Sequence, residues 1–73
     1  MFGDNLNYIR HARGFTAKQM AETINVGIRA YRAYESNDRQ PDFKKLCLLA
    51  DKLDVSTDLL LGRIPLSEFF DER

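Results

Sequence analysis

Apolar residues recur every three or four positions along most of the chain, which gathers them on one face of an α-helix. Met20, Ala21 and Ile24 follow this spacing, and so do Leu6 and Ile9. No run alternates apolar and polar residues between turn residues, as a half-buried β-strand does. The pattern predicts an all-α chain with five helices, over residues 4–13, 17–24, 27–36, 42–53 and 57–61.

Residues that cap or end helices stand at the boundaries of these segments. Thr16, Asp42 and Ser56 each precede a helical run, where a side-chain oxygen can accept a hydrogen bond from a first-turn amide. Gly14 and Gly62 each follow a helical run and suit the left-handed conformation that commonly ends a helix. The boundaries and the periodicity therefore predict the same elements.

Two turns, over residues 24–26 and 53–55, repeat one chemistry. Each has an aliphatic residue that ends a helix, then a short polar residue, then a valine that returns to the core. Asn25 and Asp54 hold the middle positions, and these side chains tolerate left-handed backbone better than most. Both turns are expected to join closely packed helices.

The helix over 42–53 has the longest apolar face. Five of its residues are predicted to meet the core, namely Phe43, Leu46, Leu49, Ala50 and Leu53. Cys47 stands among them and is interpreted as a small buried hydrophobe rather than a nucleophile.

The chain divides into a helical domain over residues 1–62 and a short tail over residues 63–73. In the tail, Pro65 ends any preceding helix and Ser67 can cap one further turn. Phe69 and Phe70 then carry apolar surface that either folds back near Phe2 or meets a second subunit.

Composition narrows the class of protein. A single cysteine excludes an internal disulfide, and no apolar stretch approaches the roughly 20 residues that span a bilayer. We therefore expect a cytoplasmic protein without a membrane contact. His11 is the only histidine, and there is no Gly-rich phosphate loop, so we expect no enzyme, metal, cofactor or small-molecule site.

Charge is balanced overall but unevenly distributed. The formal net charge is zero, which counts against binding to nucleic acid. Residues 1–41 carry six Lys or Arg against four acidic residues, whereas residues 42–73 carry five against seven. The basic half contains the corner between the second and third predicted helices.

The residues of this corner and their surroundings form a recognisable pattern. Seven separated places match, namely Gly14-Phe15-Thr16, Met20-Ala21, Ile24-Asn25-Val26, Tyr34-Glu35, Pro41, Leu46-x-x-Leu49-Ala50, and Val55-Ser56 with Leu59-Leu60. From about Leu6 to Gly62 the chain thus resembles the phage-repressor and Cro-like (XRE-type) helix-turn-helix family. The resemblance implies a compact five-helix, lambda-repressor-like fold that binds double-stranded DNA as a small transcriptional regulator, most often a repressor.

In this family the third helix enters the major groove. The resemblance therefore assigns base reading to Ile28, Arg29, Arg32 and Ala33, of which the two arginines can donate bidentately to guanine. Tyr31 and Tyr34 are assigned to packing. Arg10 and Glu35 stand where the family pairs a basic residue with the acid that ends the recognition helix, and the alternative is two separately solvated charges.

Phosphate contacts are assigned to Thr16, Lys18, Ser36, Arg39 and Gln40. The chain departs from the family pattern at two relevant positions. Ala17 replaces a common phosphate-binding Gln, and Gly27 replaces a Ser or Thr cap. The chain has fewer cationic residues than is usual in the family. Together with these departures, this predicts DNA binding that is weak or strongly dependent on dimerisation.

A homodimer on a palindromic operator is the expected assembly. Leu59, Leu60 and Leu61 are consecutive, and one face of a helix cannot bury all three. Dimer contacts are therefore predicted at Leu61, Ile64, Leu66, Phe69 and Phe70. Two other functions remain open: a protein-interaction module that keeps the fold without operator recognition, and an antitoxin-like protein.

Overall fold

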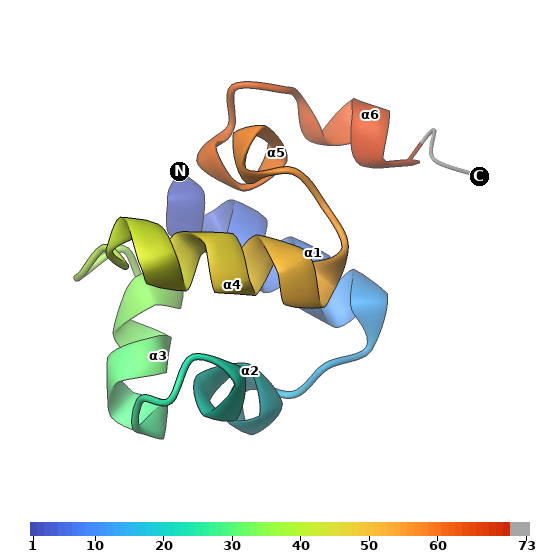
Figure 1. Ribbon diagram of the computed structural model, residues 1–73. Coiled ribbons are helices and arrows are strands. Elements are labelled where there is room, and N and C mark those ends of the chain that lie inside the picture. The colour runs from blue at the N-terminus through green and yellow to red at the C-terminus, as the bar shows by residue number, and fades with distance from the viewer. Residues whose placement is uncertain (71–73) are drawn as a thin grey trace.

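The computed structural model describes residues 1–70, without the side chain of Phe70, and folds them into six helices (Figure 1). They are α1 (Phe2–Arg13), α2 (Ala17–Thr23), α3 (Ile28–Glu35), α4 (Phe43–Leu53), α5 (Thr57–Leu61) and α6 (Leu66–Phe70). The all-α class is confirmed, with no strand in the described range. Residues 71–73 of the predicted tail lie outside the described residues.

The sixth helix corrects the predicted number of helices and the predicted cap in the tail. α6 begins at Leu66, one residue before the expected Ser67 cap. The amide of Glu68 donates to the carbonyl of Pro65 at 3.0 Å. The turn therefore starts from Pro65, whose fixed φ favours the start of a helix and which has no amide hydrogen to leave unpaired.

The other three predicted N-caps, Thr16, Asp42 and Ser56, are present. The amide of Gln19 donates to Thr16 Oγ1 at 3.0 Å while the Thr16 amide donates to Gln19 Oε1 at 2.8 Å, which completes a capping box. Asp42 and Ser56 accept from the amides three residues later. Asp54 ends α4 in the left-handed conformation, at φ 57°. Local sequence chemistry therefore defines most helix ends.

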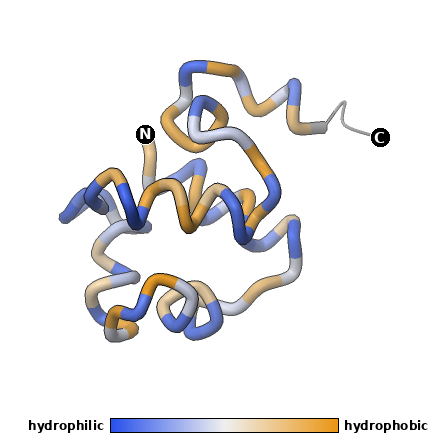
Figure 2. The backbone as a smooth tube through the Cα atoms, viewed as in Figure 1, coloured by the Kyte–Doolittle hydropathy of each residue, from blue (hydrophilic) through white to orange (hydrophobic). Residues whose placement is uncertain are grey.

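The core lies between α1 and the four helices that follow it. Leu6 and Ile9 of α1, Met20 of α2, Tyr31 of α3 and Leu53 of α4 are fully buried. α1 packs against α3, α4 and α5, and α2 packs against α3 and α4. Figure 2 shows hydrophobic and hydrophilic residues interspersed along the helices, as expected when each has one buried face.

Two predictions for α4 are wrong. Phe43 is 88% exposed and Cys47 is also exposed. Phe43 continues the apolar stripe into the first turn of α4, but the buried part of the stripe begins only at Leu49, with Leu46 half-buried. Cys47 lies about 100° around the helix from Leu46, outside the stripe.

The start of α1 lies directly against the end of α3. The Gly3 amide donates to Asn37 Oδ1 at 2.8 Å. A Cβ atom on Gly3 would lie 2.5 Å from the carbonyl oxygens of both Tyr34 and Glu35. The absence of a side chain at Gly3 therefore permits this crossing of α1 and α3.

Candidate nucleic-acid interface

Helices α2 and α3 form a helix-turn-helix. Asn25 adopts the left-handed conformation at φ 56°, and the amide of Val26 donates to the carbonyl of Ala21 at 3.0 Å. Ala21 is 2% exposed where the two helices pack, and its small side chain permits the close approach. The sharp turn predicted at residues 24–26 is confirmed.

One face of α3 is fixed in the core. Tyr31 is fully buried and Tyr34 is 7% exposed. Their rings meet edge to face, with centroids 6.4 Å apart, a favourable arrangement for aromatic pairs. Both tyrosines therefore pack, and the rotation of α3 about its axis is set by them.

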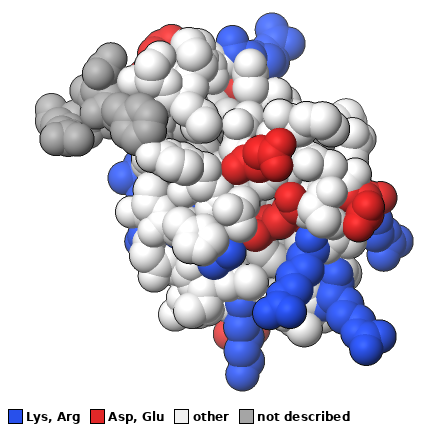
Figure 3. All heavy atoms as spheres, turned by 180° about the vertical axis from the view of Figure 1, so that it is seen from behind, with Lys and Arg blue, Asp and Glu red and all other residues white. Residues whose placement is uncertain are grey.

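The opposite face of α3 is open to solvent. Ile28, Arg29 and Arg32 are exposed, whereas Ala33 is half-buried. Lys and Arg side chains extend from the end of the molecule that α2 and α3 form (Figure 3). Three of the four residues assigned to base reading therefore share an accessible surface, and Ala33 lies at its edge.

A shallow groove runs between α2 and α3 beside this face. Lys18 and Arg32 contribute cationic side chains to its lining, and Val26 and Ile28 contribute apolar ones. Glu22 lines the same groove, and this carboxylate was not expected at the interface. It repels nearby phosphates and so restricts where a DNA backbone can lie.

The remaining phosphate candidates differ in how available they are. Arg39 and Gln40 are exposed in the loop after α3. Thr16 is exposed, and its hydroxyl oxygen accepts from the Gln19 amide, which leaves the hydroxyl hydrogen to donate to a phosphate. The Ser36 hydroxyl is placed to donate to Asp38 Oδ2, at 2.7 Å. Ser36 can therefore reach a phosphate only by leaving a carboxylate.

The end of α3 is held to α1 by a buried ion pair. Arg10 Nε donates to Glu35 Oε2 at 2.6 Å and Arg10 Nη2 donates to Oε1 at 3.2 Å. The two side chains are only 10% and 11% exposed. Arg10 Nη1 also donates to the carbonyl of Phe15 at 3.0 Å. The pair implied by the resemblance is present, and it ties α1, α3 and the loop before α2 together.

Two further donors complete the environment of Glu35. Asn7 Nδ2 donates to Oε1 at 2.7 Å, and the Tyr31 hydroxyl donates to Oε2 at 2.5 Å. Sequence reasoning assigned neither role. Tyr31 lies one helical turn before Glu35, so its spacing was a usable signal, whereas the contribution of Asn7 depends on how α1 crosses α3.

The pKa values of this cluster follow from burial and these hydrogen bonds. Burial alone raises the pKa of Glu35, but hydrogen bonds from Arg10, Tyr31 and Asn7 outweigh it and hold that pKa below its usual value. Burial, followed by the hydrogen bond to Glu35, raises the pKa of Tyr31. The hydrogen bond that Arg10 donates to Glu35 raises the pKa of Arg10. The cluster is therefore a charged pair with a neutral tyrosine at physiological pH.

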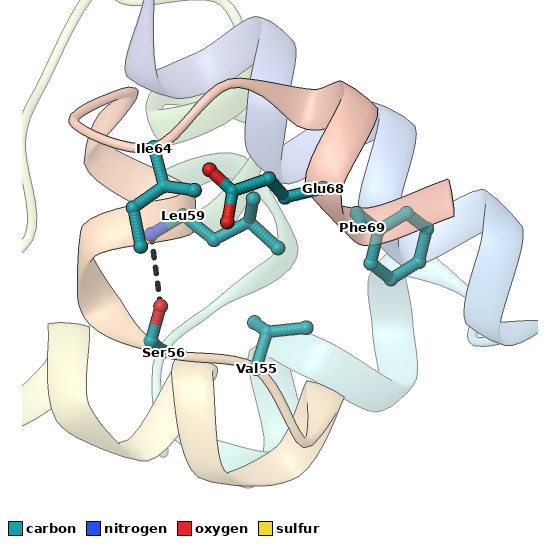
Figure 4. Close-up of a pocket in the computed structure, with 6 residues that line it drawn as sticks. All are labelled: Val55, Ser56, Leu59, Ile64, Glu68 and Phe69. Carbon is teal, nitrogen blue, oxygen red and sulfur yellow. Dashed lines mark hydrogen bonds between the residues drawn. The ribbon is translucent and has the colours of Figure 1, made fainter. Parts of the chain in front are cut away.

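Four of the five residues expected at a dimer contact have described side chains, and these four lie in two different environments. The side chain of the fifth, Phe70, lies outside the described part of the chain. Ile64, Leu66 and Phe69 are half-buried and pack against the core of their own chain. Figure 4 shows Leu59, Ile64 and Phe69 around a small hollow between α5 and α6. Leu61 is 47% exposed, so the prediction that one of the three consecutive leucines faces away from the core is confirmed.

Arg13 connects this tail to the end of α1. Its guanidinium carbon lies 4.9 Å from the centre of the Phe69 ring. Arg13 Nε also donates to the carbonyl of Leu53 at 2.9 Å. Phe69 thus packs near the C-terminal end of α1, at the opposite end of that helix from Phe2.

Three further features concern the described residues: the histidine, possible metal ligands and possible membrane-spanning helices. His11 is exposed, with Nδ1 2.8 Å from the carbonyl oxygen of Asn7. No group of three or more His, Cys, Asp or Glu side chains within residues 1–70 is placed to hold a metal ion. None of the described helices has the length and apolar character needed to cross a membrane.

Known proteins are similar to this chain in sequence and in fold. An uncharacterized HTH-type transcriptional regulator of Bacillus subtilis, YqaE, is 41% identical over 61 residues, which are 84% of this chain and 53% of the relative. The cryptic phage CTXphi transcriptional repressor RstR of Vibrio cholerae is 39% identical over 54 residues, which are 74% of this chain and 48% of the relative. The chain therefore spans about half the length of these two relatives.

A solved structure and a family profile agree with these relatives. The crystal structure of a transcriptional regulator from Listeria innocua superposes with a TM-score of 0.80 at 30% identity, covering 96% of this chain and 72% of that one. Residues 6–60 match the sequence profile of the helix-turn-helix family. The chain belongs to the phage-repressor and Cro-like helix-turn-helix family.

Proposed function

We propose that this chain binds double-stranded DNA sequence-specifically and regulates transcription, as a cytoplasmic repressor. The observation that carries the proposal is the two-sided character of α3. Its inner face is fixed by Tyr31, Tyr34 and the Arg10–Glu35 pair, while its outer face presents exposed Arg29 and Arg32. A rigidly held helix with exposed guanidinium groups suits base reading in the major groove.

Arg29 and Arg32 are the proposed base-reading donors, and Ile28 contributes an apolar contact of the kind that a thymine methyl group accepts. Lys18, Arg39 and Gln40 are the proposed phosphate contacts. The groove between α2 and α3 brings Lys18 and Arg32 to one surface. Glu22 in the same groove lies one helical turn after Lys18 and repels phosphates from its own end of α2.

The proposed assembly is a homodimer on a palindromic operator. One helix-turn-helix covers a single half-site, and a two-fold dimer reads two half-sites one helical turn apart. The names of the relatives support the regulatory role, since RstR is a transcriptional repressor and YqaE an HTH-type transcriptional regulator.

Selection of bound fragments from a random DNA pool tests this function. We expect an enriched palindrome, and we expect Arg29→Ala to relax the preference at one base step of each half-site by about 1–3 kcal/mol. Arg63→Ala is the matched control, because Arg63 is exposed near α5 and faces Asp58 at 3.5 Å. A pool that yields no enriched sequence would favour a protein-interaction module instead.

A further inference from the structure

The last residue of α1 contacts two other helices at once. Arg13 Nε donates to the carbonyl of Leu53 at 2.9 Å, and Arg13 Nη2 donates to the carbonyl of Asp54 at 3.3 Å. Both carbonyls lie at the end of α4, where a helix has no internal partner for its last carbonyls. The ring of Phe69 in α6 lies against the same guanidinium group, with its centre 4.9 Å from the guanidinium carbon. Arg13 therefore joins the end of α1 to the end of α4 and to α6.

Arg13 is also the first residue of the segment that leads from α1 toward α2, residues 13–15, which we call the linker. At the other end of the linker, the Phe15 ring lies beneath Lys52 of α4, with Lys52 Nζ 4.9 Å from the ring centre. Gly14 between them has no side chain, and a Cβ atom there would meet nothing within 4 Å. The last turn of α4 therefore contacts both ends of the linker.

The linker leads directly into the two helices of the candidate interface. The Phe15 amide donates to the Arg10 carbonyl at 3.1 Å, and Arg10 Nη1 donates to the Phe15 carbonyl at 3.0 Å. Arg10 is the residue that pairs with Glu35 at the end of α3. Thr16 follows Phe15 and caps α2, whose first turn carries the proposed phosphate contact Lys18. The position of the linker therefore determines where the first turn of α2 lies.

Helix α6 lies away from this interface and is held by few contacts. Figure 1 shows α6 beside α5 and across the molecule from α2 and α3. α6 has five residues, and a hollow of about 200 Å³ remains between it and α5 (Figure 4). We propose that Arg13 is a positioning residue for DNA binding. The Phe69 ring holds its guanidinium group on the end of α4, this fixes the linker and the first turn of α2, and loss of the ring contact weakens DNA binding from the far side of the molecule.

The ring contact limits the size of the effect. A contact can shift the population of a binding-competent conformation only by its own free energy. A cation–π contact at a partly exposed site changes an equilibrium by about two- to fivefold, so the affinity for a single half-site should fall by at most that factor. On a palindrome each of two copies loses the contact, and the expected loss is about four- to twenty-fivefold.

Three substitutions in the full chain isolate the contact. Phe69→Leu keeps apolar bulk in α6 and removes the aromatic face. Phe69→Tyr keeps the ring and is the matched control. Arg13→Gln removes the guanidinium group. The position of the Phe69 ring in α6, across the molecule from α2 and α3, separates its effect from a direct contact with DNA.

Fluorescence anisotropy on one half-site of the selected palindrome is the first measurement, and it rests on the DNA-binding function proposed above. We expect Phe69→Leu to weaken binding by about two- to fivefold and Phe69→Tyr to bind as the wild type does. In the Arg13→Gln chain, Phe69→Leu should make no further difference, because its effect passes through Arg13. The slope of log affinity against log salt concentration should stay the same in Arg13→Gln, since a lost phosphate contact would reduce it by about 0.9.

Hydrogen exchange without DNA is the second measurement. The Phe15 amide should exchange faster in Phe69→Leu than in the wild type. The Tyr31 amide, which donates to the Gly27 carbonyl at 3.1 Å within the helix-turn-helix, should exchange at its wild-type rate. This pattern separates a local release of the linker from a general loss of stability.

Four results would overturn the proposal. A Phe69→Leu chain with wild-type half-site affinity and wild-type exchange at Phe15 would show that the ring does not hold the linker. Equal losses in Phe69→Leu and Phe69→Tyr would assign the effect to packing. A loss on the palindrome alone would place Phe69 between two chains, and a shallower salt slope in Arg13→Gln would make Arg13 itself a phosphate contact.

Failure of the wild-type chain to bind any DNA would instead count against the proposed function. Exchange at Phe15 in Phe69→Leu would then still decide whether α6 holds the linker through Arg13.

Discussion

Glu35 is the residue whose side chain holds the end of α3 to α1. Its carboxylate accepts hydrogen bonds from Arg10, Asn7 and Tyr31, and its side chain is 11% exposed. Replacing one member of a buried pair leaves the other charge without its partner. We therefore expect Glu35→Gln to lower the free energy of unfolding at pH 7 by about 2–4 kcal/mol.

Because of Glu35, we also expect the free energy of unfolding to fall at acidic pH. The pKa of Glu35 lies below its usual value in the folded chain, so the folded state favours the ionised form. Ionised Glu35 makes its full contribution to the free energy of unfolding above the pKa that it has in the unfolded chain, about 4.3. That contribution is lost as the pH falls through the lower pKa of Glu35 in the folded chain. Urea unfolding from pH 7 to pH 3 should show the wild type approaching Glu35→Gln on acidification. A constant difference across this range would contradict the assignment, and exposed Glu22→Gln is the control.

Residue-scale sequence reasoning succeeded where the cause is local. Thr16, Asp54 and Asn25 were recognisable because caps and left-handed turns depend on one side chain and its nearest backbone. It failed for Phe43 and Cys47, because helical spacing indicates a face but not how far the core extends along it. The donor role of Asn7 was not predictable either, since it requires knowing where α1 crosses α3.

At the scale of elements, the crossing of α1 and α3 depends on Gly3. Alanine in place of a helical glycine ordinarily stabilises a helix by about 0.5–1 kcal/mol. Here the added Cβ would lie 2.5 Å from two carbonyl oxygens of α3, so the helices must separate. We expect Gly3→Ala to lower stability by about 1–3 kcal/mol in urea unfolding.

Whether Gly3→Ala lowers or raises stability shows how closely α1 and α3 approach. Gly27→Ala serves as a comparison, because a Cβ at Gly27 meets open space and only the start of α3 is affected. If Gly3→Ala instead raised the unfolding midpoint, α1 and α3 would not approach as closely as described.

Helix α6 is expected to stabilise its own chain rather than join two chains. Phe69 packs on the core and lies beneath the Arg13 guanidinium group. Phe69→Ala should cost about 1–2 kcal/mol of stability and leave self-association in sedimentation unchanged. If Phe69→Ala instead dissociated a dimer without changing the stability of the chain, Phe69 would belong to a contact between two chains.

The predicted elements were mostly correct because periodicity and caps agreed for the first five helices. The tail was harder to predict. Its apolar residues gave the same signal for folding back and for a subunit contact. In the structure α6 packs beside α5 and Arg13 of its own chain, and the subunit contact stays a prediction. Sequence could identify the apolar surface but not its partner.

For the molecule as a whole, charge distribution matters more than net charge. The formal charge is zero, yet Lys18, Arg29 and Arg32 are exposed at the end formed by α2 and α3. A dimer with so few cations neutralises only several phosphates. Log affinity should therefore fall against log salt concentration with a slope of about −4 to −7. DNA titrations at several salt concentrations measure this slope. An affinity that does not change with salt concentration would exclude contact with the phosphate backbone.

The exposure of Arg29 and Arg32 was predictable, because the resemblance placed both on one helix and the buried tyrosines fix its rotation. Glu22 in the groove and the engagement of Ser36 by Asp38 were not predictable. The place of Glu22 depends on how α2 and α3 pack, whereas the contact between Ser36 and Asp38 depends on the conformation of the turn after α3.

The placement of α3 in the major groove is the central claim, and methylation interference on the selected palindrome tests it most directly. Dimethyl sulfate marks guanine N7, which lies in the major groove where arginine donates. We predict that methylation blocks binding at guanines in two clusters about one helical turn apart, and that Arg29→Ala removes the effect at one guanine in each cluster. Binding that tolerates methylation at every guanine N7 would contradict the account.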